Sequence, residues 1–124
     1  MNKERPVNFN VDLTKLPITS TVSILHRASG VFLFAGTGLL LWMLAASLKS
    51  AQSFAELQEV LASGGVKFAI WLVLAALIYH TVAGVRHLIM DLGIGESLEA
   101  GVLGAQLTLA CSVILALLAG VWLW

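Results

Sequence analysis

Ionisable side chains interrupt an apolar stretch in the second half of the sequence. The segment "IYHTVAGVRHLIMD", residues 78–91, contains two histidines, an arginine and an aspartate. A helix turns about 100° per residue, so three of these ionisable residues and a glycine fall on one narrow face of a helical segment: His80, Gly84, His87 and Asp91. Ionisable groups within a membrane-spanning helix are costly and are a functional hypothesis by default.

His80 is the deepest of these groups. It precedes Arg86 by about 9 Å of helix rise, which places its imidazole within the hydrocarbon of a membrane. Two interpretations fit this position. In the first, His80 donates a hydrogen bond to a neighbouring helix and Gly84 permits close packing. In the second, neutral imidazole binds haem iron and the glycine leaves room for the flat macrocycle. Spacing along one helix does not distinguish them.

A second polar group precedes the first apolar stretch. In "SILHR", Ser23 and Arg27 are four residues apart and share a helix face, with His26 adjacent. A hydroxyl and a fixed cation are what a quinone carbonyl needs as it gains electrons and protons. This favours a functional role for Ser23 and Arg27, whereas Arg86 is expected to be an interfacial anchor whose charge snorkels to water.

The composition indicates a membrane protein with one domain, residues 1–124. The chain has 124 residues, too few for a two-domain enzyme. Its hydrophobic fraction is 59% and its charged fraction 11%, whereas soluble domains have about 45–50% and about 25%. A formal net charge of zero gives no bulk attraction for nucleic acid. The single cysteine, Cys111, cannot form a Cys-based metal cage.

Three stretches without charged residues, 28–48, 68–85 and 100–124, predict an all-α membrane protein with three transmembrane helices, the second of which extends past Arg86 if that side chain snorkels or finds a partner. Each is close to the roughly 20 residues that cross a hydrocarbon core. The predicted spans are residues 28–48, 68–90 and 100–124, after an N-terminal segment 1–27. That segment has no cleavable signal pattern, so the first span is expected to direct its own insertion.

Two shorter helical features are expected around the first span. Pro17 favours a helix that enters the membrane and continues into the span, with Ser29-Gly30 as a place where it can bend. Between the first two spans, Ser53 and Glu56 have the spacing of a capping box. This predicts a short interfacial amphipathic helix, which we expect to end at Gly64-Gly65.

The basic residues predict the orientation, because cytoplasmic loops are enriched in lysine and arginine. Lys49 and Lys67 fall on one side of the predicted topology, and the others fall on the opposite side: Lys3, Arg5, Lys15, Arg27 and Arg86. The N-terminus and the 86–99 loop are therefore expected in the cytoplasm of a bacterial-type inner membrane, with the C-terminus outside. The four tryptophans would gather near the outer surface: Trp42, Trp71, Trp122 and Trp124.

The motifs "RPVN", "PIT…SILHRASG" and "YHTVAGVRHLIMD" resemble the cytochrome b membrane-anchor subunits of succinate dehydrogenase, over nearly the whole chain. The resemblance implies a complex in which a flavoprotein subunit oxidises succinate and an iron-sulfur subunit relays the electrons. This chain and a second small membrane subunit would hold haem b and reduce ubiquinone. The chain itself would contain no succinate-oxidising residue.

The resemblance also implies roles for individual residues. His80 matches the axial ligand of the haem iron, with the second histidine supplied by the other membrane subunit. Ser23 and Arg27 match quinone-binding residues. His26, Arg27 and His87 lie where haem propionates are held, and Asp91 matches a position near the proton route. His26 is expected nearer the surface than His80, which leaves one deep histidine and requires a partner chain for bis-histidine ligation.

Other classes remain open. A fumarate reductase-type anchor would run the same couple in reverse, and a haem-free structural anchor would leave His80 without a purpose. A small transporter or proton channel is disfavoured, because there is no visible repeat and no charged residue in the third span.

Overall fold

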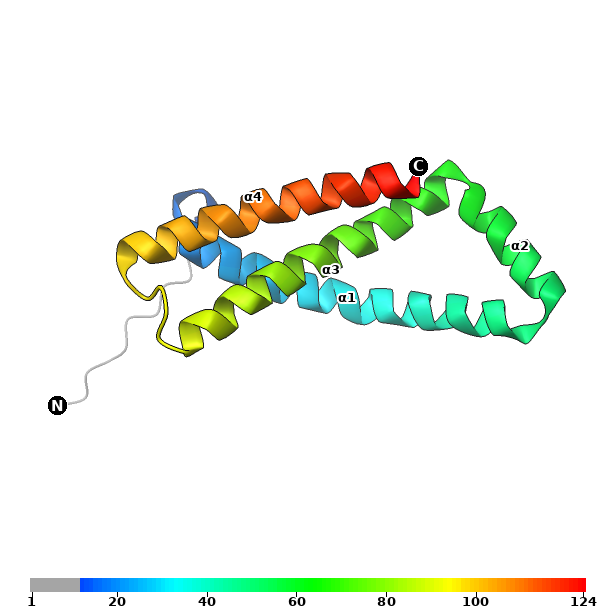
Figure 1. The fold of residues 1–124 in the computed structure, drawn as a ribbon, viewed down its shortest axis with the longest axis horizontal. Coiled ribbons are helices and arrows are strands. Elements are labelled where there is room, and N and C mark those ends of the chain that lie inside the picture. The colour runs from blue at the N-terminus through cyan, green and yellow to red at the C-terminus, as the bar shows by residue number, and fades with distance from the viewer. Residues whose placement is uncertain (1–11) are drawn as a thin grey trace.

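Three long helices form an elongated bundle that a fourth helix closes at one end (Figure 1). The structure is a computed structural model and describes residues 12–124. A 3-10 turn at Leu13–Lys15 precedes the helices, whose bounds are α1 Ile18–Lys49, α2 Ala51–Ala62, α3 Gly64–Asp91 and α4 Leu98–Leu123. Within the described residues there is no strand.

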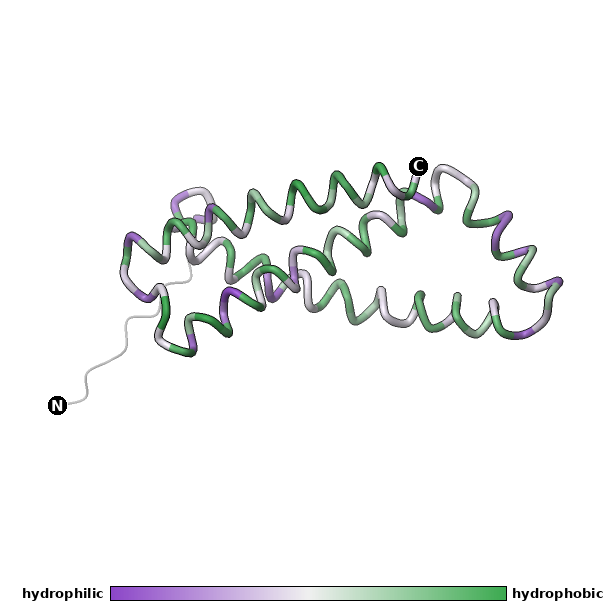
Figure 2. Tube along the Cα trace, in the orientation of Figure 1, coloured by the Kyte–Doolittle hydropathy of each residue, from purple (hydrophilic) through white to green (hydrophobic). Residues whose placement is uncertain are grey.

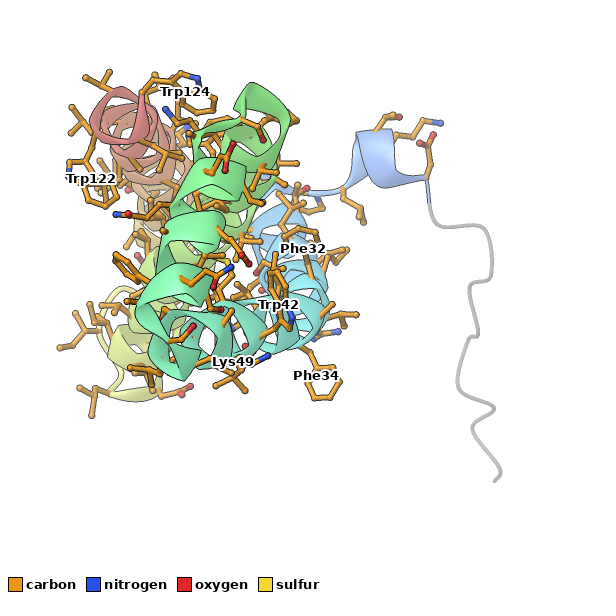
Figure 3. All side chains as sticks on the ribbon, turned by 90° about the vertical axis from the view of Figure 1, so that its right-hand side faces the viewer. Phe32, Phe34, Trp42, Lys49, Trp122 and Trp124 are labelled. Atoms are coloured by element: carbon orange, nitrogen blue, oxygen red, sulfur yellow. The ribbon has the colours of Figure 1, made fainter. Side chains whose placement is uncertain are left out.

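α1, α3 and α4 are each long and apolar enough to cross a membrane. The all-α, three-span prediction is therefore confirmed. Figure 2 shows mostly apolar residues along these helices, with hydrophilic residues around α2, around the α3–α4 turn and also where α1 and α3 cross. Many large apolar side chains are exposed, with Phe34 reaching 86% and pointing away from the bundle in Figure 3. Such a surface suits lipid or another membrane chain rather than water.

α1 is a single helix from the membrane entry through the first predicted span. Pro17 is its N-cap residue, and the Pro17 carbonyl accepts hydrogen bonds from the amide and hydroxyl of Thr21. The helix passes through Ser29 and Gly30 without ending. The Ser29 hydroxyl donates back to the His26 carbonyl, at 2.7 Å.

The short helix between the first two spans is α2, but the predicted caps are wrong. Ser50 is the N-cap residue and accepts from the Ser53 amide at 3.0 Å. The Ser53 hydroxyl donates to the Ala46 carbonyl of α1, and Glu56 accepts from Gln52. The helix begins one turn earlier than predicted because Ser50 offers the same capping oxygen directly after α1 ends.

The predicted glycine stop is also wrong. α2 ends at Ala62, with Ser63 as its C-cap residue, and Gly64 and Gly65 are the first two residues of α3. A tight turn at Ser63, whose amide donates to the Val60 carbonyl, is sufficient to reverse the chain.

Close approach of small residues lets α3 pack against both of the other long helices. One buried cluster consists of Val22, Ala83 and Ala105, one residue from each of the three helices. The Tyr79 hydroxyl donates to the Val22 carbonyl at 2.7 Å, and Trp71 Nε1 donates to the Ala116 carbonyl at 2.8 Å. These bonds satisfy polar groups that have no water to bond with inside a membrane.

The turn between α3 and α4 lies at the end of the bundle opposite α2 (Figure 1). Gly93 and Gly95 have φ angles of 80° and 75°, which side chains rarely tolerate. Ser97 then caps α4 by accepting from the Ala100 amide, at 3.2 Å. α1 begins and α3 ends at this same end of the bundle, so the two helices are antiparallel.

Candidate functional site

Three histidines converge where α1 crosses α3. The rings of His26 and His80 are stacked, with centroids 4.2 Å apart and planes 13° apart. The edge of His87 approaches His26, with centroids 5.0 Å apart. A Cβ atom at Gly84 would lie 3.4 Å from His26 Nε2. The space that Gly84 leaves on α3 is therefore occupied by His26, where the sequence suggested a macrocycle.

The sequence predicts a deep His80 and a His26 nearer the surface, whereas their rings are in direct contact, with centroids 4.2 Å apart. Because α1 and α3 are antiparallel and cross, position along one helix does not give depth relative to the other.

The Nδ1 atom of His80 is held by α1. It lies 3.0 Å from the Ser29 hydroxyl oxygen and 3.1 Å from the His26 carbonyl oxygen. A carbonyl oxygen only accepts, so Nδ1 must carry the hydrogen. The neutral imidazole therefore presents its lone pair on Nε2, for which residues 12–124 provide no hydrogen bond.

Ser23 and Arg27 line one pocket of about 370 Å³ between the first turns of α1 and the last turns of α3. From α3, Arg86 and His87 contribute polar groups, and Ile24 of α1 adds an apolar wall. Two arginines and a serine hydroxyl thus face one small volume. This arrangement can hold a flat molecule that carries oxygen acceptors.

Arg86 does not snorkel to water, so that prediction is wrong. The side chain is only 9% exposed, and its Nη2 donates to the Gly101 carbonyl at 3.2 Å. A Cβ atom at Gly104 would lie 3.3 Å from its Nε, which is buried without a partner in the described part of the chain. α4 covers Arg86 because Gly104 leaves room for the side chain and the Gly101 carbonyl accepts from it, and the sequence pattern indicates neither contact.

Asp91 lies apart from this pocket. It is the last residue of α3, it is exposed, and it is not among the residues that line the pocket. The single ion pair within residues 12–124 joins Lys15 and Asp12, at 3.5 Å. Asp91 therefore forms no ion pair with Arg27 in this chain.

Ser29 is the site residue that the sequence analysis missed. It was interpreted with Gly30 as a place for a bend, whereas its side chain contacts His80 on a different helix. The available signal was its position three residues after His26, which puts both side chains on neighbouring parts of the same face.

Comparisons with known proteins agree with the motifs. A family model described as "Succinate dehydrogenase/Fumarate reductase transmembrane subunit" matches residues 1–119. The succinate dehydrogenase cytochrome b556 subunit of Coxiella burnetii is 41% identical, and the match covers 100% of both chains. The b556 subunit of Paracoccus denitrificans is 35% identical, over 92% of this chain and 88% of its own. The mitochondrial cytochrome b560 subunit of Sus scrofa is 34% identical, over 94% of this chain and 72% of its own.

Proposed function

The chain belongs to the family of succinate dehydrogenase and fumarate reductase transmembrane subunits, and from this premise we propose that it ligates haem b and helps to reduce ubiquinone. The relatives are named as succinate dehydrogenase subunits, which favours succinate dehydrogenase over a fumarate reductase-type anchor. The observation that carries the haem proposal is the bonding of His80.

A histidine that ligates a metal usually donates its other ring N–H to a carbonyl or carboxylate, which fixes the tautomer and the ring orientation. The His80 Nδ1 hydrogen has such acceptors in the His26 carbonyl and the Ser29 hydroxyl. Its Nε2 is left with the lone pair that iron requires. Haem b bound there supplies a one-electron redox centre.

The second axial ligand is proposed to come from a second small membrane subunit. The lone pair of an imidazole nitrogen lies in the ring plane. Because the rings of His26 and His80 are stacked face to face, their lone pairs cannot point at one iron from opposite sides. His26, Arg27 and His87 are instead assigned to the vicinity of the haem propionates.

Ser23 and Arg27 are proposed to bind the quinone in the pocket that they line. The Ser23 hydroxyl can donate to a carbonyl oxygen, and the Arg27 guanidinium supplies a fixed positive charge as that oxygen gains electron density. Asp91, exposed one turn beyond His87, is assigned to the proton route between water and the pocket.

The chain is proposed to work within a complex that includes an iron-sulfur subunit and a flavoprotein subunit. Electrons from succinate would reach the quinone at the end of the bundle that holds Ser23 and Arg27. The N-terminus is proposed to face the cytoplasm of a bacterial-type inner membrane, which puts this end on the cytoplasmic side.

Replacing Ser23→Ala and Arg27→Leu tests the quinone site. Each change is expected to slow succinate-to-quinone electron transfer by roughly thirtyfold to a thousandfold, because a lost charged or hydrogen-bonding donor costs about 2–4 kcal/mol. Succinate oxidation by a soluble artificial acceptor is expected to survive. The measurement is the ratio of the two activities in the purified complex.

The matched control is Thr37→Ala, which removes a hydroxyl that bonds only the Leu33 carbonyl of the same helix. It is expected to leave both activities unchanged. Wild-type quinone reduction in the Ser23 and Arg27 variants would refute the site. An equal loss of both activities would assign these residues to assembly instead.

A further inference from the structure

Two consecutive residues of α1 meet the imidazole of His80. The Ser29 hydroxyl oxygen lies 3.0 Å from His80 Nδ1, and this contact is partly buried. A Cβ atom at Gly30 would lie 3.1 Å from His80 Cε1. Ser29 therefore contacts one atom of the ring, and the space that Gly30 leaves is taken by the adjacent atom; neither feature depends on the pocket lined by Ser23 and Arg27.

The hydrogen-bond roles around Ser29 follow from counting donors. Its hydroxyl has one hydrogen, and the His26 carbonyl accepts it at 2.7 Å. The lone pairs of the hydroxyl oxygen are then left for the Nδ1 hydrogen of His80, which the His26 carbonyl also accepts at 3.1 Å. The Nδ1 hydrogen thus has two acceptors that are themselves bonded to each other.

Gly30 leaves the space that the His80 ring occupies on a second side. A Cβ atom 3.1 Å from a ring carbon is tighter than ordinary contact, so any side chain at this position would have to displace the imidazole. The ring is itself held by the stacked His26 on one face. A displacement would therefore lengthen the bonds to Ser29 and the His26 carbonyl.

We propose that Ser29 and Gly30 are positioning residues for His80. Ser29 holds the hydrogen on Nδ1 and fixes the rotation of the ring, and Gly30 leaves the space that this rotation needs. The inference rests on the proposed ligation of haem by His80. Loss of an outer partner of a metal-binding histidine typically weakens the hold on the metal by roughly 10–100-fold.

The test measures haem release from the purified, detergent-solubilised complex. The rate of haem transfer to excess apomyoglobin is expected to rise roughly 10–100-fold in Ser29→Ala. The g values of the low-spin ferric haem, measured by electron paramagnetic resonance, are expected to shift because one of the two acceptors that orient the ring is lost. Ser29→Thr keeps the hydroxyl and is expected to release haem at close to the wild-type rate.

Ser47→Ala is the matched control for the serine. The Ser47 hydroxyl makes the same bond within α1, to the Leu44 carbonyl at 2.7 Å, and contacts no histidine. For the glycine, Gly30→Ala is compared with Gly38→Ala, where a Cβ atom has open space. Of these two glycine variants, only Gly30→Ala is expected to shift the g values, although its Ser29 hydroxyl is still present.

Unchanged release and unchanged g values in both Ser29→Ala and Gly30→Ala would overturn the inference. Equal acceleration in Ser29→Ala and Ser29→Thr would also overturn it, because the hydroxyl would then not be the cause. Should Ser29→Ala fail to assemble, Gly30→Ala tests the same ring position. His80→Leu separates failure of the proposed ligation from failure of the proposed positioning. An unchanged low-spin spectrum in this variant refutes ligation by His80. Loss of the low-spin spectrum supports ligation, and the Ser29 and Gly30 variants then decide whether these residues position the ring.

Discussion

Stacked imidazoles at the centre of the site have different surroundings. His80 has two acceptors on Nδ1, whereas the Nε2 atom of His26 faces the position where Gly84 lacks a side chain. A metal ligand needs a fixed tautomer and an unbonded lone pair. Among the hydrogen bonds of residues 12–124, only those of His80 meet both conditions, although both histidines lie where α1 crosses α3.

Replacing each histidine separately tests whether His80, and not His26, ligates haem. His80→Leu is expected to abolish or severely perturb the low-spin haem spectrum, because no nitrogen remains at the ligand position. His26→Phe keeps a ring to stack on His80 and is expected to retain a low-spin haem. Reduced-minus-oxidised difference spectra of the two complexes provide the measurement, and the opposite pattern would transfer the ligand role to His26.

The sequence predicted some of these residues and not others, for a physical reason. Ser23, Arg27 and His87 were found because helical spacing brings polar groups to one face, and the structure gathers all three in one pocket. Ser29 was missed because its partner His80 is 51 positions away on another helix. The burial of Arg86 was missed for the same reason, since it depends on two positions of α4, the space at Gly104 and the carbonyl of Gly101.

At the level of whole elements, glycines determine how closely the helices approach. A Cβ atom at Gly36 of α1 would lie 3.1 Å from Val73 Cγ1 of α3, and one at Gly120 of α4 would lie 3.2 Å from Trp71 Nε1. Helices in lipid gain no hydrophobic stabilisation from association, so such contacts and hydrogen bonds hold them together. The crossing that brings the histidines together depends on this approach.

Gly36→Leu is therefore expected to destabilise the assembled complex by about 1–3 kcal/mol, because it forces α1 away from α3. Gly38→Leu, two residues along the same helix, has open space and is expected to be tolerated. The measurement is the fraction of intact complex after heating in detergent, followed by size-exclusion chromatography. Equal sensitivity of the two variants would contradict packing at Gly36 as the cause.

Helix identity was easier to predict than helix ends. Runs without charge located the three spans because burying a charge in hydrocarbon is costly. The ends depend on local capping, and both Ser50 and Ser53 offer a capping oxygen, so the spacing to Glu56 was not decisive. Pro17 was informative because α1 starts directly after it.

Across the whole molecule, the site lies at one end and the short helix at the other. α2 and the residues Lys49 and Lys67 mark one end, and the α3–α4 turn and the pocket with Ser23 and Arg27 mark the opposite end. Figure 3 views the bundle from the α2 end, with Trp42 on α1, Trp122 on α4 and Trp124 directly after α4. Trp71 contacts the last part of α4, so it belongs to this end as well.

The proposed orientation of the two ends in the membrane rests on charge. Five basic residues favour a cytoplasmic location for the end of the bundle that holds the pocket. Lys3 and Arg5 lie outside the described residues. The other three lie at that end: Lys15, Arg27 and Arg86. Lysines and arginines near spans are retained in the cytoplasm. If the pocket binds quinone as proposed, it would have to face the side of the membrane on which the proposed electron-delivering subunits lie.

Cysteine labelling in sealed, right-side-out vesicles tests this orientation. In a Cys111→Ala background, three exposed positions provide the reporters: Lys15→Cys, Gln58→Cys and Glu96→Cys. A maleimide that cannot cross membranes is expected to label position 58 in intact vesicles, and positions 15 and 96 only after permeabilisation. Labelling of 58 and 96 from the same side would break the three-span arrangement, because α3 separates them. Labelling of 15 and 96 alone in intact vesicles would keep the three spans but invert them, placing the pocket on the outer face, where the charge bias does not favour it.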